Sequence, residues 1–172
     1  MTTEIRAITV WQPWASLLGT PVGTTHAGRA KFAKNYETRS WATDYRGPIA
    51  IHAAAKPVHE TLRLITDYAA LRTICEALIP IVFRGQVPEG MTWQTFAADV
   101  ERYCAALPRR AVICVGRLAD CRLITPELLA RVPQRELAVG DWTPGRYAWK
   151  IADRRPQPPA TVNGAQGLWR WR

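Results

Sequence analysis

The sequence predicts an α+β domain, and three observations lead to that prediction. Short segments near both ends of the chain alternate apolar and polar residues with the period of two that is typical of strands. Two longer segments between residues 57 and 107 instead carry apolar residues at helical spacing. The length of 172 residues suits one domain with a substantial core. We therefore expect residues 1–172 to form a single domain, with a helical insertion at about residues 57–107.

The N-terminal part is predicted to contain a strand, a short helix and a loop. Residues 5–10 alternate in the manner of a first strand. Pro13 suits the first turn of a helix over residues 14–18, because proline lacks the N–H group that would be unpaired there. Residues 19–28 are mostly glycine and threonine, which favours a loop.

Two strands, at residues 36–41 and 49–53, are predicted on either side of a turn that ends in Gly-Pro. Glu37 and Arg39 are two residues apart on the first strand, so their side chains project from the same face. Lys34 has the opposite parity and joins them only if the chain bends where the strand begins. An acid between two bases on a strand is a candidate site, and the alternative is an ion pair on a solvated face.

The middle of the chain predicts two amphipathic helices. In the first, at residues 57–79, apolar side chains recur at i, i+4, i+7, i+11 and i+14 from Leu64 onward. Residues 80–90 are predicted to be a loop, and Thr92 is a candidate N-cap for a second helix that ends at Pro108. Such stripes are typical of core packing, and this part of the chain is mildly acidic. We expect these helices to pack on the sheet, away from any ligand.

The last third of the chain predicts further strands. Residues 111–124 alternate as one long strand or two, and a short helix with a threonine cap follows at residues 125–132. A turn then leads into a strand at residues 146–152. Three prolines within residues 154–159 predict an irregular or edge segment, because proline cannot donate to a strand ladder. Residues 165–172 are expected to close the sheet.

The basic residues are concentrated in the two flanking segments. The formal net charge is +9, of which residues 1–56 contribute +4, residues 57–107 contribute −2 and residues 108–172 contribute +7. A basic surface attracts polyanions through counterion release and long-range steering. The pattern favours a polyanionic partner, and solubility or arginine-rich codon usage is the alternative explanation.

Composition argues against several other classes of protein. The apolar fraction of 48% and the charged fraction of 22% are typical of soluble globular proteins. We expect no membrane segment or secretory leader, because no apolar run approaches the ~20 residues of a membrane span. The sequence has no CxxC pair and no histidine at zinc-ligand spacing. We therefore predict a cytoplasmic protein without a metal or cofactor, in which the cysteines are buried and reduced: Cys75, Cys104, Cys114 and Cys121.

Five stretches of the sequence resemble parts of one known family. They are Trp11-Gln12-Pro13-Trp14-Ala15-Ser16-Leu17, Lys34-x-x-Glu37-x-Arg39, Tyr45-Arg46-Gly47-Pro48-x-x-Ile51-His52-Ala53, Gly145-Arg146-Tyr147-Ala148-Trp149 and Gly164-x-x-Gly167-Leu168-Trp169. On these residues the chain resembles the ASCH family, a branch of the PUA-like β-barrels that is associated with RNA. The resemblance covers both ends of the chain but little of residues 57–107. It implies a PUA-like β-barrel of the ASCH type, with the middle helices as an insertion.

The resemblance implies that the partner is RNA or a modified nucleoside. Such a pocket uses aromatic faces for bases, amide or carboxylate groups for base edges, and cations for phosphates. His52 lies in a buried strand and is either a core histidine or part of the pocket wall. The candidate binding residues are Trp11, Gln12, Trp14, Arg39, Trp41, Arg46 and His52, beside Lys34 and Glu37.

An enzymatic alternative rests on Lys34 and Glu37. A buried lysine with a lowered pKa can act as a general base, and a nearby carboxylate can accept or return the proton. Some ASCH proteins hydrolyse the amide of N4-acetylcytidine with a lysine, a threonine three residues later and a glutamate from elsewhere. Here Glu37 occupies the position of that threonine. The sequence therefore favours binding over an amidohydrolase with Lys34 as general base and Glu37 as its carboxylate.

Two further alternatives remain open. Another ASCH branch cleaves RNA, although no paired histidines or carboxylate cluster here indicates a ribonuclease. A protein-interaction module is also compatible with the sequence, because a fold does not fix a function. The sequence predicts no particular oligomeric state.

Overall fold

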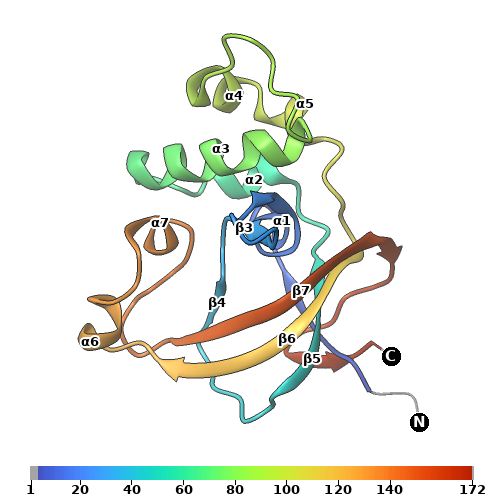
Figure 1. Cartoon of the computed structure of the whole chain (residues 1–172), viewed down its shortest axis with the longest axis vertical. Helices are drawn as coiled ribbons and strands as arrows, with labels where there is room; N and C mark the ends of the chain where they lie inside the picture. The colour runs from blue at the N-terminus through green and yellow to red at the C-terminus, as the bar shows by residue number, and fades with distance from the viewer. Residues whose placement is uncertain (1–3, 172) are drawn as a thin grey trace.

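The structure, a computed structural model, describes residues 4–171 and is built on a six-stranded sheet that curls into half a barrel (Figure 1). Its strands are β1 (Arg6–Val10), β4 (Tyr36–Arg39), β5 (Gly47–Ala53), β6 (Ala111–Leu123), β7 (Tyr147–Thr161) and β8 (Leu168–Arg170). Their order across the sheet is β4-β7-β6-β5-β1-β8. β1 and β5 run parallel, and the other neighbouring pairs run antiparallel. The predicted α+β class and a barrel-like sheet are confirmed.

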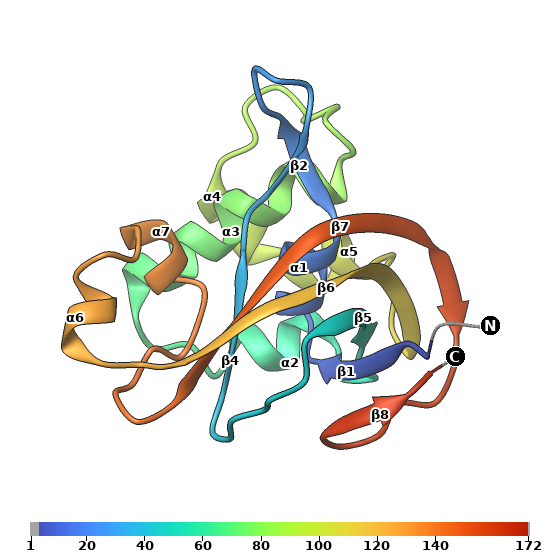
Figure 2. The same ribbon diagram turned by 60° about the horizontal axis from the view of Figure 1, so that its bottom comes forward.

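β6 and β7 form a long antiparallel pair that sweeps across the molecule (Figure 2). β4 pairs with residues 147–150 of β7, and the N–H group of Ile151 donates to the main-chain oxygen of Asn35. Beyond residue 151, within the described part of the sheet, β7 is paired with β6 alone. Pro156, Pro158 and Pro159 lie in this edge part, where a missing N–H group costs no bond on the open side. The predicted edge segment is confirmed. The strand does not end at residue 152 as predicted, because irregularities in the β6–β7 register accommodate the prolines.

The segment at residues 19–28 is not all loop, as the sequence predicted. It contains β2 (Pro21–Thr24), which pairs antiparallel with β3 (Ala30–Phe32). Val22 packs against the helices, and Phe32 is buried. These contacts with distant residues stabilise a hairpin whose glycines and threonines alone favour a loop.

The inserted helices are α2 (Val58–Leu62), α3 (Tyr68–Val82), α4 (Trp93–Ala98) and α5 (Val100–Cys104). The first predicted helix is therefore two, and Asp67 caps the second by accepting from the N–H groups of Ala69 and Ala70. α3 also continues through Pro80, against the prediction of a loop there, because Ile79 and Ile81 on either side are buried. The predicted cap at Thr92 is confirmed.

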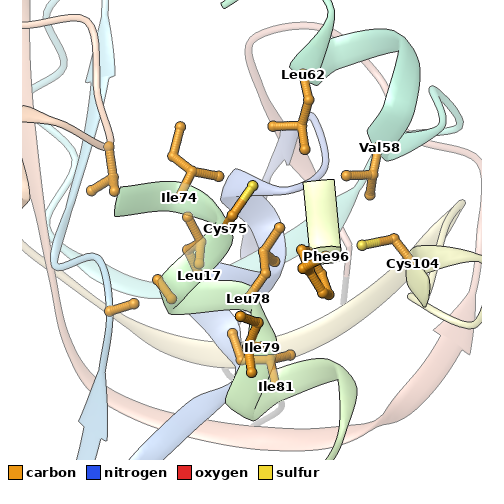
Figure 3. Close-up of a cluster of buried hydrophobic side chains, with 13 residues drawn as sticks. Leu17, Val58, Leu62, Ile74, Cys75, Leu78, Ile79, Ile81, Phe96 and Cys104 are labelled. Atoms are coloured by element: carbon orange, nitrogen blue, oxygen red, sulfur yellow. The ribbon is translucent and has the colours of Figure 1, made fainter. Parts of the chain in front are cut away.

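Two hydrophobic cores flank α1 (Trp14–Gly19), and Figure 3 shows the one among the helices. Leu17 joins this helical core, whereas Ala15 and Leu18 face the core against the sheet. α1 therefore joins the helical layer to the sheet. In the helical core, a fully buried aromatic residue such as Phe96 typically contributes ~3–5 kcal/mol to the free energy of unfolding, relative to alanine. The helical core also contains Val58, Leu62, Ile74, Cys75, Leu78, Ile81 and Cys104.

The last two helices are α6 (Pro126–Leu129) and α7 (Gln134–Leu137). Thr125 caps α6 as predicted, but α6 is shorter than the predicted helix and α7 was not predicted. No helix in the described part of the chain is both long enough and apolar enough to cross a membrane.

The four cysteines are free. Cys75, Cys104 and Cys114 are buried as predicted, and burial raises the pKa of Cys75 to about 11. Cys121 is only partly buried, against the prediction, because it lies near the end of β6.

Candidate functional site

A cavity of about 440 Å³ lies between β4, the end of β1 with the start of α1, and the loop that precedes β7. We call it the β4 cavity. Its aromatic walls are Trp11, Trp14 and Trp41. Its charged lining residues are Lys34, Glu37, Arg39, Asp141 and Arg146.

Glu37 lies between Lys34 and Arg39 in this cavity. The Nζ atom of Lys34 is 3.7 Å from Oε2 of Glu37, and Nη2 of Arg39 is 3.3 Å from Oε1. Arg39 Nη2 also donates to the main-chain oxygen of Thr9 in β1, at 2.8 Å. The side chain of Lys34 is 1% exposed and that of Glu37 is 12% exposed. The three charges are therefore a largely buried row, and the alternative of a solvated strand face is wrong.

Lys34 reaches this row because the chain bends at Ala33, just before β4. The N–H group of Lys34 donates to the main-chain oxygen of Leu17 at 3.1 Å. The N–H groups of the next two residues, Asn35 and Tyr36, donate to the buried carboxylate of Glu136 at 2.9 and 3.0 Å. These contacts fix the start of β4 with the side chain of Lys34 turned toward Glu37.

Arg154 of β7 holds the same segment from another side. Its Nη1 atom donates to the main-chain oxygens of Leu18 and Lys34, and Nη2 donates to Oδ1 of Asn35. Burial lowers the pKa of Arg154 to about 10, although the nearby Glu136 opposes that shift. Glu136 and Arg154 were not predicted as site residues, because nothing in their local sequence patterns connects them to residues a hundred positions earlier.

Burial also lowers the pKa of Lys34, because an ammonium group loses its hydration there. Glu37 and Glu136 act against this shift, and Arg39 adds to it. The main chain at Gly140 closes over the lysine: a Cβ atom at this position would lie 3.1 Å from Lys34 Nζ and 2.8 Å from Trp142 Nε1. Lys34 is therefore closely enclosed by protein at Gly140, and both residues line the β4 cavity.

A second charged pair faces the cavity from the loop before β7. Arg146 Nε lies 3.2 Å from Oδ2 of Asp141, and Arg146 Nη2 donates to the main-chain oxygen of Thr38 at 3.3 Å. The hydroxyl of Thr38 accepts from the N–H group of Asp141 at 3.2 Å. The sequence predicts only a turn before residue 146 and a strand that begins there, so neither Asp141 nor Arg146 was predicted as a site residue.

Trp11 presents the most open aromatic surface of the site, with 49% of the residue exposed. The Nζ atom of Lys56 lies 4.4 Å from the centre of its ring. Trp41 is held more firmly, because its ring packs edge-to-face on Trp149 with centroids 4.6 Å apart. Trp11 is therefore the ring on which a planar ligand has the most room to stack.

Beyond Trp11 lies a larger cavity of about 960 Å³, which we call the His52 chamber. It shares the walls Thr9, Trp11, Arg39 and Trp41 with the β4 cavity. His52 is only 2% exposed, its Nε2 lies 3.0 Å from the main-chain oxygen of Val162, and burial lowers its pKa. His52 thus meets both sequence-based descriptions, since it is a core histidine that also lines a cavity.

Two predicted binding residues lie outside both cavities. Gln12 is fully buried: its Oε1 accepts from the N–H group of Ser16, and its Nε2 donates to the main-chain oxygen of Pro108. Both the oxygen and the nitrogen of its amide bond the main chain, and the side chain is buried, so it presents no edge to a base. Arg46 donates to the main-chain oxygens of its own turn and lies 3.7 Å from Asp120. The other predicted residues, Trp11, Trp14, Lys34, Glu37, Arg39, Trp41 and His52, line one cavity or both.

No profile of a known protein family matches this sequence, and no curated protein sequence matches it. The resemblance to the ASCH family therefore stays a prediction. Within residues 4–171, no three His, Cys, Asp or Glu side chains are grouped so that they could hold a metal ion.

Proposed function

We propose that the protein binds RNA or a modified nucleoside, with one base seated in the β4 cavity. The observation that carries this proposal is the buried row of Lys34, Glu37 and Arg39 at the foot of a cavity with tryptophan walls. A carboxylate accepts from the amino group of a base, an ammonium group donates to a base carbonyl, and a tryptophan ring stacks on a base face. The cavity volume of about 440 Å³ is within the usual range for small-molecule sites.

The rest of the molecule supports this proposal in two ways. The half-barrel sheet with its helical layer is compatible with a PUA-like fold of the ASCH type, which the sequence motifs suggest. The net charge of +9 favours a polyanionic partner.

The direct test is a calorimetric titration of the four ribonucleosides and of N4-acetylcytidine into the wild type, Trp11→Ala and Glu37→Gln. We expect at least one ligand to bind, and each variant to weaken it by the ~1–3 kcal/mol of a lost stacking or charge-assisted contact. Arg46→Ala is the control, because it removes a cation that lines neither cavity. Absence of binding by every nucleoside and by short single-stranded RNA would contradict the proposal.

A second candidate, hydrolysis of an N4-acylated cytidine, is favoured by the lowered pKa of the buried Lys34. A neutral Lys34 amine would take a proton from water while the water oxygen bonds to the acyl carbon. The bond to N4 then breaks and N4 receives the proton, which gives cytidine and the free acid. The ASCH amidohydrolases have a threonine hydroxyl at the position that Glu37 occupies here. The nearby hydroxyl of Thr38 already accepts a hydrogen bond from the N–H group of Asp141, so it does not replace that threonine.

The two candidates separate in an assay of cytidine release from N4-acetylcytidine. Binding alone predicts no release by the wild type. Release that falls by the ~10²–10⁴-fold of a lost general base in Lys34→Ala, and rises in Glu37→Thr, would favour the hydrolase. RNA cleavage, the third candidate, gains no support from the lining residues, where His52 is bonded to the main chain.

A further inference from the structure

The β4 cavity and the His52 chamber are two parts of one cleft. They share four lining residues, Thr9, Trp11, Arg39 and Trp41. The β4 cavity alone, at about 440 Å³, offers room for a base and its sugar, and the chamber adds about 960 Å³. A ligand that binds in the first part therefore extends into the second if it carries further groups.

The two parts differ in charge. The β4 cavity mixes three cations with the carboxylates of Glu37 and Asp141. The described residues that line the His52 chamber include the cations Arg39 and Arg110 and no carboxylate. Lys56 adds a third positive charge beside the shared ring of Trp11. The chamber is therefore suited to an anion, whereas the β4 cavity is suited to a neutral group with both donors and acceptors.

The chamber also offers hydrogen-bond donors that the protein leaves unused. Arg39 lines both parts of the cleft, and its Nε atom, which is buried beneath that lining, has no hydrogen-bond partner among the described residues. The Nη2 atom of Arg110 donates one hydrogen bond to Oδ1 of Asn163, at 3.0 Å. The other N–H groups of its guanidinium therefore remain for a ligand. A buried donor without a partner is rare enough in native proteins to suggest a missing one.

The loop after β7, residues 163–167, forms one wall of the chamber. Gly164 packs directly on the ring of His52, where a Cβ atom would lie 2.4 Å from Cε1, and Gly167 has a left-handed φ of +70°. Within residues 4–171, the main-chain N–H groups of Gly164 and Gln166 donate no hydrogen bond. Loops of this kind, with glycines that allow close approach, can present main-chain N–H groups to phosphate oxygens.

We propose that the His52 chamber binds a phosphate group of the same ligand whose base occupies the β4 cavity. The preferred ligand is then a nucleotide, either a mononucleotide or a unit of a single-stranded RNA, whereas a free nucleoside occupies only the β4 cavity. Arg39 and Arg110 bind the phosphate, and Trp11 marks the boundary between base and phosphate. This inference rests on the proposed function and names the chemical class of its ligand.

The test compares four probes in the same titration: a ribonucleoside, its 5′- and 3′-monophosphates, and a single-stranded tetraribonucleotide of the same base. We expect at least one phosphorylated probe to bind about tenfold more tightly than the nucleoside, as one charge-assisted contact allows. In Arg110→Gln this preference should disappear while the affinity for the nucleoside stays unchanged. Arg109→Gln is the matched control, because Arg109 loses the same charge but lines a separate groove beside α2 and α5.

The outcomes distinguish this inference from the proposed function. Equal affinities for the nucleoside and for all three phosphorylated probes would overturn the phosphate site and leave the base site intact. A preference that Arg110→Gln and Arg109→Gln reduce equally would also overturn it, because that result indicates only general attraction to a basic surface. A preference confined to the tetranucleotide supports a phosphate of a strand, and one shown by a monophosphate supports a mononucleotide. Thermal unfolding of each variant verifies that it is folded.

Discussion

Lys34 and Glu37 approach within 3.7 Å of each other, although an odd spacing of three residues would set them on opposite faces of a regular strand. The bend at Ala33 turns the lysine toward the glutamate, and contacts to Leu17, Glu136 and Arg154 hold the segment in that form. The charge row at the foot of the β4 cavity is therefore built by tertiary contacts and not by the strand alone.

The lowered pKa of Lys34 predicts a pH dependence of stability. Between the folded-state pKa and the ordinary value of 10.5, the unfolded chain binds the proton of Lys34 more tightly than the folded protein does. The contribution of Lys34 to the free energy of unfolding therefore rises with pH across that window, by ~1.4 kcal/mol for each unit of pKa difference. Lys34→Met removes this contribution.

We therefore expect the difference in unfolding free energy, wild type minus Lys34→Met, to increase in urea titrations as the pH rises from the folded-state pKa of Lys34 toward 10.5. Lys31→Met, at an exposed lysine on β3, is the control for the loss of one charge. A difference that stays flat or decreases with pH would mean that burial does not disfavour the charged form of Lys34.

Glu136→Gln should lower both stability and ligand affinity. The carboxylate accepts from the N–H groups of Asn35 and Tyr36, and an amide replaces these charge-assisted bonds with weaker ones. The expected loss is ~1–3 kcal/mol in the free energy of unfolding. Glu89→Gln, at an exposed residue, should change neither quantity. If Glu136→Gln destabilises the protein but leaves ligand affinity unchanged, the start of β4 does not need Glu136 to position Lys34.

Gly140→Ala should disturb the site more than its small size suggests. The added methyl group would lie 2.8 Å from Trp142 Nε1 and 3.1 Å from Lys34 Nζ, so one of these groups must move. Such overpacking typically costs ~1–3 kcal/mol. Gly28→Ala offers a comparison, because it has a left-handed φ of +71° but nothing within 4 Å of the new methyl group. We expect both variants to lower the melting temperature and only Gly140→Ala to weaken ligand binding.

Shortening the loop between α3 and α4 within residues 84–90 should leave ligand affinity unchanged. The described residues of α2, α3, α4 and α5 line neither the β4 cavity nor the His52 chamber. A modest loss of stability is expected, which circular dichroism during heating would measure. If a variant that melts cooperatively no longer binds, the helical insertion contributes to the site.

Local patterns in the sequence predicted much of the fold. Alternation placed β1 and β6, turns placed β5 and the start of β7, and a threonine cap placed the starts of α4 and α6. The patterns failed where distant residues decide the outcome. α3 continues through Pro80 because its neighbours are buried, and β7 continues through three prolines because one side of it is open.

The candidate site was predictable to the extent that its residues are close in sequence. Lys34, Glu37, Arg39 and Trp41 belong to one stretch, and Trp11 and Trp14 to another. Asp141, Arg146 and the supporting Glu136 and Arg154 join them only through the sheet order and the loop before β7, which no single-sequence pattern encodes. Gln12 illustrates the opposite error, because a polar residue between two tryptophans suggested binding while its amide bonds the main chain.

The most direct test of the account is a crystal structure of the protein with whichever ribonucleoside monophosphate binds most tightly in the titrations. We predict that the base lies in the β4 cavity against Trp11, with a polar edge within hydrogen-bond distance of Glu37 or Lys34, and that the phosphate lies beside Arg110. A ligand bound elsewhere on the molecule, with both parts of the cleft empty at a saturating concentration, would contradict the account.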